Sequence, residues 1–181
     1  MNKTRNMILV ALFTALTAIG AFIKIPLPFV PITLQVIFVF MAGLILGKKL
    51  GALSQILYVG LGLIGIPVFT QGGGPGYILK PSFGYLIGFI VGAYVIGLII
   101  EKGEVNFTRS LIGSLCGLIV IYALGVPYLY IILNRVMGVD ISFLGALKSG
   151  MLVFLPGDLL KSLIVAYLVP NIHSRLKYFQ D

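Results

Sequence analysis

Six long apolar runs dominate this sequence and constrain its fold more than any other feature. They occupy residues 7–23, 32–46, 50–66, 82–100, 110–125 and 151–169. Each is close to the length of about 17–25 apolar residues that an α-helix needs to cross a membrane. Charged residues make up 10% of the chain, against about 25% in a typical soluble domain. So little charge cannot cover a water-facing surface, and the sequence therefore predicts a protein embedded in the lipid bilayer.

The fold class follows from the cost of unpaired backbone groups in lipid. An open sheet would leave N–H and C=O groups there without hydrogen bonds, and the chain lacks the alternating segments of about ten residues that build a membrane β-barrel. We therefore expect an all-α integral membrane protein whose six transmembrane helices form one domain over residues 1–181. The first run is long for the core of a signal peptide, so we expect it to be retained as a helix.

Proline, glycine and charge mark the connections between the runs. Three prolines within residues 26–31 end the first helix and keep the following loop extended. Gly47, followed by two lysines, predicts a tight basic turn, and a glycine-rich loop occupies residues 69–81. Residues 126–149 are too polar to span a membrane, and we expect an interfacial or capping segment there.

Basic residues are shared unevenly between the two sides that six spans create. The side that holds both termini has eight of them: Lys3, Arg5, Lys48, Lys49, Lys102, Arg109, Arg175 and Lys177. The other side has four: Lys24, Lys80, Arg135 and Lys148. Because cytoplasmic loops are enriched in Lys and Arg, we expect both termini in the cytoplasm and the three longest connections on the outer face of the cell membrane. This orientation accounts for the net charge of +8 without a nucleic-acid partner.

Two opposite charges inside the last apolar run are the strongest functional signal. An ionisable residue at membrane depth is costly and is usually functional. Asp158 and Lys161 are three positions apart, so a helix places them on one face as neighbours. If a helix restarts at Pro156, Asp158 lies near the positive end of its dipole, which favours the carboxylate. A polar ligand site fits this pair, and the alternative is an internal ion pair that only fixes helix packing.

The glycine-rich loop 69–81 is the second candidate site. Glycines allow close backbone approach to a ligand, and Tyr77, like Tyr85 just after the loop, offers an apolar ring with a polar tip. The alternative is a flexible turn between two helices. A nucleotide-binding phosphate loop is excluded because G-x-x-x-x-G-K-[ST] occurs nowhere in the sequence. The chain therefore shows no means of hydrolysing ATP.

Small residues form two stripes at helical spacing. Ala11, Ala15 and Ala18 form the first, and such stripes let another helix approach closely in lipid. Their spacing does not decide whether that helix belongs to this chain or to a partner. We assign the second stripe to packing within the chain: Gly84, Gly88 and Gly92.

Residue types that enzymes and metal sites require are sparse. His173 is the only histidine, Cys116 is the only cysteine, and none of the apolar runs holds a close pair of carboxylates. We therefore expect neither catalysis nor a bound metal or other cofactor.

Five short segments match one known family in order along nearly the whole chain. They are residues 31–35 (PITLQ), 41–47 (MAGLILG), 65–69 (GIPVF) with the glycine loop, 84–89 (GYLIGF) and 156–161 (PGDLLK). Together they resemble the BioY family, the biotin-specific substrate-binding subunits, or S components, of energy-coupling-factor transporters.

The resemblance implies a six-helix S-component fold that holds biotin near the outer face. It also implies partners, namely a transmembrane coupling subunit and two ATPase subunits that energise transport. By family precedent Asp158 and Lys161 lie against biotin, and Ala11 and Ala15 form the docking surface. The expected substrate-binding set is completed by Gln35, Gln71, Gly73, Tyr77, Lys80 and Tyr85. In one departure from the family pattern, Lys80 stands before Pro81 where glycine is expected.

Two other functions remain open from the residues alone. One is a self-contained secondary transporter or channel for a small carboxylate-bearing solute, proton-coupled through Asp158. Inverted repeats or two corresponding broken helices would favour it, and the sequence has one span interrupted by Pro-Gly and no repeat. The other is a structural membrane subunit without a ligand.

Overall fold

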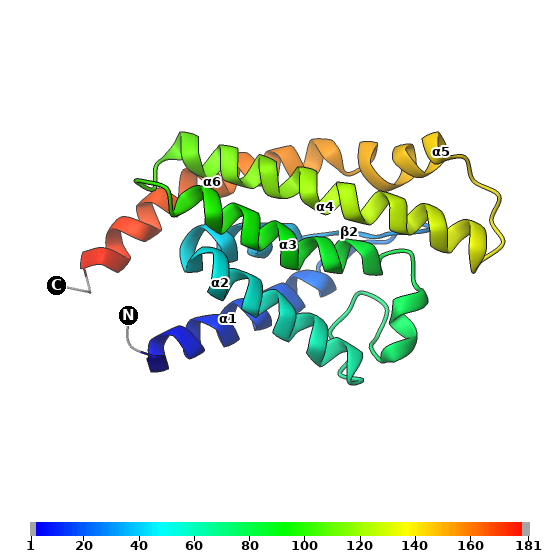
Figure 1. The fold of residues 1–181 in the computed structure, drawn as a ribbon, viewed down its shortest axis with the longest axis horizontal. Helices are drawn as coiled ribbons and strands as arrows, with labels where there is room; N and C mark the ends of the chain where they lie inside the picture. The colour runs from blue at the N-terminus through cyan, green and yellow to red at the C-terminus, as the bar shows by residue number, and fades with distance from the viewer. Residues whose placement is uncertain (1–2, 179–181) are drawn as a thin grey trace.

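The computed structural model describes residues 3–178 and is almost entirely helical (Figure 1). In chain order the elements are α1 (Lys3–Phe22), β1 (Lys24–Ile25), β2 (Ile32–Thr33), α2 (Gln35–Leu63), the 3₁₀ helix η1 (Pro75–Leu79), α3 (Phe83–Ile100), α4 (Phe107–Arg135), α5 (Phe143–Leu147), the π-helix η2 (Lys148–Leu152) and α6 (Leu155–Tyr178). The predicted all-α class is confirmed. The prediction that both termini lie on the cytoplasmic side concerns residues 1–2 and 179–181, which lie outside the described part of the chain. The side chains of Arg175 and Lys177, which were counted on that side, lie outside it too.

The predicted count of six transmembrane helices is not confirmed. Over residues 3–178, five helical segments are long and apolar enough to cross a membrane: Lys3–Phe22, Gln35–Leu63, Phe83–Ile100, Phe107–Arg135 and Phe143–His173. The difference arises because α2 contains both the second and the third predicted runs. The last of the five segments joins α5, η2 and α6 into one stretch of chain.

A bend at Gly47 divides α2 into two parts. Gly47 has φ 77° and ψ −177°, a conformation outside the helical region that side chains rarely adopt. A Cβ built on Gly51 would lie 2.9 Å from the carbonyl oxygen of Ala42, so the chain after the bend packs against the chain before it. Glu101, which follows α3, holds the bend by accepting a hydrogen bond from Lys48 N at 2.9 Å and pairing with Lys48 Nζ at 3.0 Å.

Helix α4 is longer than the predicted run 110–125, because it continues through Pro127 to Arg135. The expectation that the whole of 126–149 forms an interfacial segment was therefore wrong for its first part. Apolar residues there, such as Leu129 and Leu133, are fully buried and sustain the helix. Asn134, in the last turn of α4, holds the segment that follows the helix. Its side chain donates to Ile141 O and accepts from Ile141 N.

Helix α3 lies between α2 and α4 and is fitted to α4 by its glycines. A Cβ on Gly88 would lie 2.9 Å from Ile121 Cα, and one on Gly92 would lie 3.1 Å from Ile121 Cγ1. A Cβ on Gly84 would collide with the side chain of Tyr128. The prediction that this glycine stripe packs within the chain is confirmed. Small residues at these positions let the two helices approach closely.

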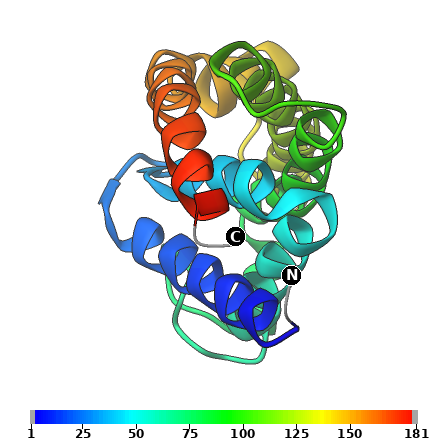
Figure 2. The ribbon, with the colours of Figure 1, turned by 90° about the vertical axis from the view of Figure 1, so that its left-hand side faces the viewer.

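Helix α1 lies at the edge of the bundle. Seen end-on, it is separated from α4 and α6 by α2 (Figure 2). It is tied to α2 by Thr14, whose hydroxyl donates to Ser54 O at 2.9 Å. Ala11 and Ala15 are exposed, whereas Ala18 is half-buried. The stripe that they begin is therefore not covered by the described part of this chain.

The two ends of the bundle carry different connections (Figure 1). Helix α1 begins, α6 ends and α3 joins α4 at one end, on the left of the view, whereas η1 and α5 lie at the opposite end. Strands β1 and β2 pair antiparallel, Lys24 with Thr33 and Ile25 with Ile32, as expected for an extended loop. This short hairpin contributes Val30, Pro31 and Thr33 to the lining of the candidate site.

Candidate functional site

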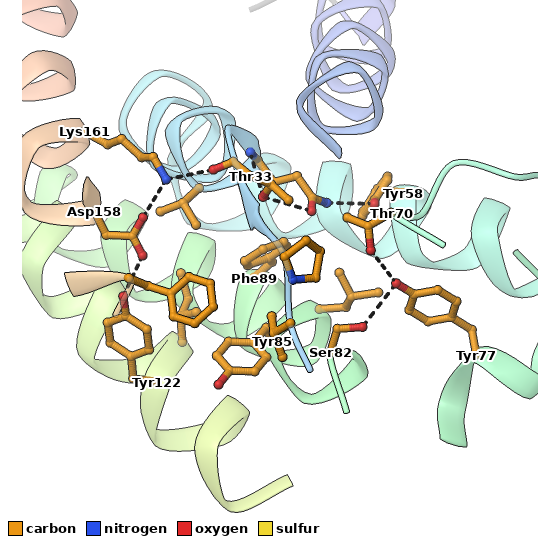
Figure 3. A pocket seen from close by; sticks show the side chains of 17 residues that line it. Thr33, Tyr58, Thr70, Tyr77, Ser82, Tyr85, Phe89, Tyr122, Asp158 and Lys161 are labelled. Atoms are coloured by element: carbon orange, nitrogen blue, oxygen red, sulfur yellow. Dashed lines mark hydrogen bonds and ion pairs between the residues drawn. The ribbon is translucent and has the colours of Figure 1, made fainter. Parts of the chain in front are cut away.

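A pocket lies among α2, α3, α4, α6 and the β1–β2 connection (Figure 3). Its walls combine an apolar lining with side chains that carry hydrogen-bonding groups. The apolar residues are Val30, Pro31, Val36, Leu86, Phe89, Ile121 and Phe154. The residues with polar atoms are Thr33, Gln35, Tyr58, Thr70, Tyr77, Ser82, Tyr85, Tyr122, Asp158 and Lys161. A mostly apolar cavity with a few placed polar groups is the usual form of a small-molecule site.

One end of the pocket is charged. Asp158 and Lys161 are 4% and 8% exposed, and Lys161 Nζ lies 2.7 Å from Asp158 Oδ1. Helix α6 begins at Leu155, as the position of Pro156 predicted, so Asp158 lies in its first turn. The helix dipole there favours a carboxylate. The pair is thus formed by local spacing on one helix and stabilised by the helix start.

Two further groups from other elements complete the charged end. Tyr122 on α4 donates a hydrogen bond from its hydroxyl to Asp158 Oδ2 at 2.6 Å. Lys161 Nζ donates to the backbone oxygen of Thr33 on β2 at 2.7 Å. Both buried charges therefore have more than one partner, which a buried ion pair requires because each unpaired charge is costly to desolvate.

The other end of the pocket holds neutral groups. Gln35 Nε2 donates to the Tyr58 hydroxyl at 2.8 Å, which in turn donates to Val68 O at 3.1 Å. Thr33 Oγ1 lies 3.2 Å from Gln35 Oε1 and donates to it. Thr33 thereby touches both ends of the pocket, through its backbone oxygen at the charged end and through its side chain here.

The Tyr77 hydroxyl organises a second neutral cluster beside the first. It lies 2.9 Å from Thr70 Oγ1 and accepts a hydrogen bond from Ser82 Oγ at 3.1 Å. Its ring packs on Phe69, with ring centroids 4.4 Å apart. The glycine-rich loop thus places the side chain of Tyr77 in the pocket wall. The loop is also bonded to β1, because Lys24 Nζ donates to Thr70 O.

Aromatic rings line the pocket between its two ends. Phe89 and Tyr85 come from α3, and Phe154 immediately precedes α6. Tyr85 is held in place because its hydroxyl donates to Gly150 O in η2 at 2.7 Å. The pocket therefore offers flat apolar surfaces to the middle of a ligand and polar groups to its two ends.

Five of the eight residues predicted to bind substrate line this pocket: Gln35, Tyr77, Tyr85, Asp158 and Lys161. The other three, Gln71, Gly73 and Lys80, are exposed residues of the glycine-rich loop and are not among the lining residues. Gly73 has a packing reason to be glycine, because a Cβ there would collide with Ile66 O.

Sequence reasoning missed several polar groups of the pocket, chiefly Tyr58, Tyr122, Thr70 and Ser82. Tyr58 and Tyr122 each carry a hydroxyl inside a long apolar run, which was the one available signal. The partner of Tyr58, Gln35, is 23 positions away across the bend in α2, and the partner of Tyr122, Asp158, is 36 positions away on α6. No helical spacing relates residues so far apart.

Comparison with known proteins places this arrangement in a known context. The model of the BioY family matches residues 1–178. A "Probable biotin transporter BioY" from Lysinibacillus sphaericus is 54% identical over 134 residues, covering 74% of this chain and 68% of that protein. The "Biotin transporter BioY" of Thermotoga maritima is 45% identical over 166 residues, covering 91% of this chain and 93% of that protein.

A solved structure is also similar. The crystal structure of the S-component for biotin from an ECF-type ABC transporter matches with a TM-score of 0.83 and 32% sequence identity. The match covers 96% of this chain and 95% of that chain. Both the fold and the sequence therefore agree with the same group of proteins.

Proposed function

This chain belongs to the BioY family, and we propose that it captures biotin as the S component of an energy-coupling-factor transporter. It is a multi-pass membrane transport protein and not an enzyme. The observation that carries the proposal is the pocket with a buried Asp158–Lys161 pair at one end, neutral hydroxyl and amide groups at the other, and aromatic walls between them.

The chemistry of biotin matches such a pocket. Biotin presents two ureido N–H donors, a carbonyl acceptor, an apolar bicycle and a carboxylate tail. A carboxylate such as that of Asp158 accepts N–H bonds, and an ammonium such as that of Lys161 donates to an oxygen. Rings such as that of Phe89 supply apolar cover for the bicycle.

We propose Asp158 and Lys161 as the residues that recognise the polar atoms of biotin. Gln35, Tyr77 and Tyr85 contribute to the site from the pocket wall. A contribution of the exposed loop residues Gln71, Gly73 and Lys80 stays a prediction, since the pocket lining does not include them. The whole chain, residues 1–181, acts as one substrate-binding domain with biotin as its transported ligand.

The bend in α2 suggests how the chain crosses the membrane. If the parts of α2 before and after Gly47 each cross it, the five long helical segments make six crossings. An even number of crossings agrees with the start of α1 and the end of α6 lying at the same end of the bundle (Figure 1). We propose that this end is cytoplasmic and that η1 and α5 face outwards, because basic residues are more numerous on the proposed cytoplasmic side.

The chain has no nucleotide-binding phosphate loop, so transport driven by ATP would need other subunits. We propose a transmembrane coupling subunit and two ATPase subunits, with lipid around the remaining surface. The exposed Ala11 and Ala15 on α1 are the proposed docking surface. They leave a shallow face on a helix whose main contacts within the described residues are with α2 and β2.

Isothermal titration of the purified chain with biotin tests the proposal directly. We expect saturable binding of one biotin per chain and no comparable heat with vitamins that lack a ureido ring. Uptake into proteoliposomes should require the coupling and ATPase subunits. Uptake by this chain alone, driven by a proton gradient, would instead identify a self-contained secondary transporter, and absence of biotin binding would contradict the proposed ligand.

A further inference from the structure

Tyr122 on α4 is a buried residue outside the set of site residues predicted from the sequence. Its side chain is 7% exposed, and its hydroxyl donates to Asp158 Oδ2 at 2.6 Å. The two residues come from different helices, so this bond forms only when α4 and α6 pack together. It reaches the carboxylate oxygen that Lys161 does not contact.

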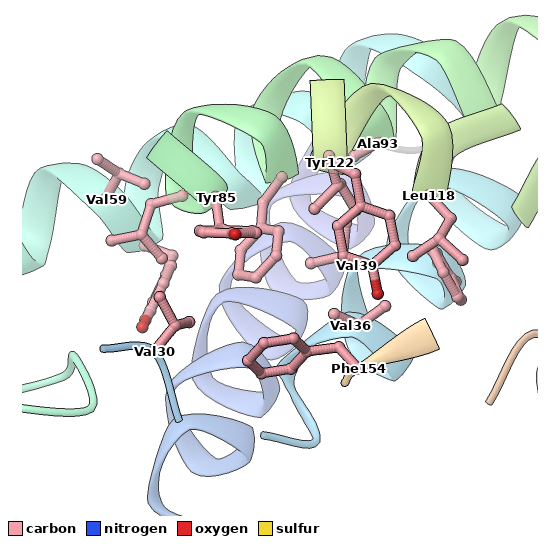
Figure 4. Packing of buried hydrophobic residues seen from close by; sticks show 14 of the residues in the cluster. Val30, Val36, Val39, Val59, Tyr85, Ala93, Leu118, Tyr122 and Phe154 are labelled. Carbon is pink, nitrogen blue, oxygen red and sulfur yellow. The ribbon is translucent and has the colours of Figure 1, made fainter. Parts of the chain in front are cut away.

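The ring of Tyr122 is fixed by its neighbours. It belongs to the main apolar cluster, together with Val39, Leu118 and Phe154 (Figure 4). It also lines a second groove between α4 and the α5–α6 segment, where every other lining residue is apolar, among them Val126, Met151 and Leu155. The hydroxyl finds no polar partner on the groove side, so burial drives it towards Asp158.

The bonds to Asp158 divide its two oxygens between two donors. An ionised carboxylate has about four lone-pair sites. Lys161 takes one on Oδ1 and Tyr122 takes one on Oδ2, which leaves about two for a ligand. With both oxygens held, the carboxylate plane of Asp158 cannot turn freely about the Cβ–Cγ bond. With Lys161 as the only donor, a single hydrogen bond to Oδ1 would restrict that rotation.

We infer that Tyr122 is a positioning residue for ligand binding. Its hydroxyl fixes the plane of the Asp158 carboxylate, so that the remaining acceptor sites are directed at the N–H donors of the ligand. Order established before binding raises affinity because less freedom is lost when the ligand arrives. This role rests on the proposed biotin site, and Tyr122 acts through Asp158.

A double-mutant cycle with biotin tests the inference. The detergent-purified full-length chain and the variants Tyr122→Phe, Asp158→Asn and Tyr122→Phe/Asp158→Asn are titrated calorimetrically. Phe keeps the ring and its packing and removes only the hydroxyl. We expect Tyr122→Phe to weaken biotin binding about tenfold or more, the usual effect of losing a hydrogen bond to a charged group. In the Asp158→Asn background the same change should alter affinity less than about twofold, because the two residues act as one unit.

Two controls separate positioning from general damage to the fold. Tyr130→Phe removes a hydroxyl from the same helix, at a ring that packs on Phe143 outside the pocket, and should leave affinity unchanged. The binding stoichiometry reports the folded fraction of each variant, so affinity is measured on folded protein only. Wild-type affinity in Tyr122→Phe overturns the inference, and so does an equal loss with and without Asp158, which indicates a packing role. A wild-type chain that fails to bind biotin overturns the proposed function itself, and this inference with it.

Discussion

Lys161 Nζ lies 2.7 Å from Asp158 Oδ1, so the two side chains form a direct ion pair. Each has a second partner from a distant part of the chain, Thr33 O for Lys161 and the Tyr122 hydroxyl for Asp158. The pair is therefore a junction of α6 with β2 and α4. These bonds orient both charges for a ligand that binds there. A change to either residue should therefore lower both ligand affinity and the stability of the fold.

Asp158→Asn should lower biotin affinity by roughly 30-fold or more. Truncating one partner of a buried, charged hydrogen bond typically costs about 2–5 kcal/mol, largely from the group left unpaired. Lys161→Ala should have a similar effect, and the double variant should be clearly less than additive. Calorimetric titration measures affinity, and thermal unfolding of the same samples measures stability.

The outcome also distinguishes a binding role of this pair from a structural one. A structural ion pair would show lower thermal stability with near-normal biotin affinity in the protein that stays folded. Asp140→Asn is the matched control, because Asp140 is an exposed aspartate outside the pocket lining. It should change neither quantity.

Gly47→Ala should destabilise the fold at the bend of α2. Gly47 has φ 77°, and a Cβ there would lie 2.6 Å from Glu101 Oε1, the atom that accepts the bond from Lys48 N. Backbone strain of this kind costs about 1–3 kcal/mol. At roughly 2–4 °C per kcal/mol for a chain of this size, the melting temperature should fall by several degrees.

Gly60 provides the control for that experiment. It lies in the same helical element and a Cβ there would meet nothing within 4 Å. Gly60→Ala should therefore leave stability unchanged or raise it slightly, since alanine favours the helix. Equal effects of the two substitutions would show that the bend does not depend on glycine.

Bulky residues at Ala11 and Ala15 should block assembly with the coupling subunit without affecting biotin binding. Both alanines are exposed on α1, and Leu or Trp there would fill the shallow face that a partner helix needs. Co-purification with the coupling and ATPase subunits measures assembly, and titration of the isolated chain measures binding. Leu160→Trp, at an exposed position on α6, should leave assembly intact. Equal loss of ligand binding in the alanine variants would instead indicate that the stripe supports the fold.

Cysteine labelling in intact cells should reveal the orientation. Cys116 is first replaced by alanine, because it is the only native cysteine. A cysteine at Gly76 should react with a membrane-impermeant reagent, whereas one at Lys102 should not. Gly76 suits this test better than Gly73, since a Cβ at Gly76 meets nothing within 4 Å and one at Gly73 would collide with Ile66 O. Asn2, a further position expected to be protected, lies outside the described residues. The reverse labelling would contradict outward-facing capture.

Several features could be predicted from the sequence because they depend on local spacing or composition. The apolar runs and low charge indicate helices in lipid whatever their arrangement. Asp158 and Lys161 meet because residues three apart on a helix are always neighbours, and Pro156 marks the start of that helix. Glycines in α3 anticipate a close helix contact in the same way.

The tertiary structure alone decided which distant residues complete the pocket. Tyr122 reaches Asp158 across 36 positions, and Lys161 reaches Thr33 across 128. The bend at Gly47, the continuation of α4 through Pro127 and the exclusion of Gln71 and Lys80 from the pocket were decided there as well. The physical reason is that helical periodicity fixes only which residues share a face of one helix. Which face meets which neighbour depends on how the helices are rotated and packed, and that follows from the contacts of the whole bundle.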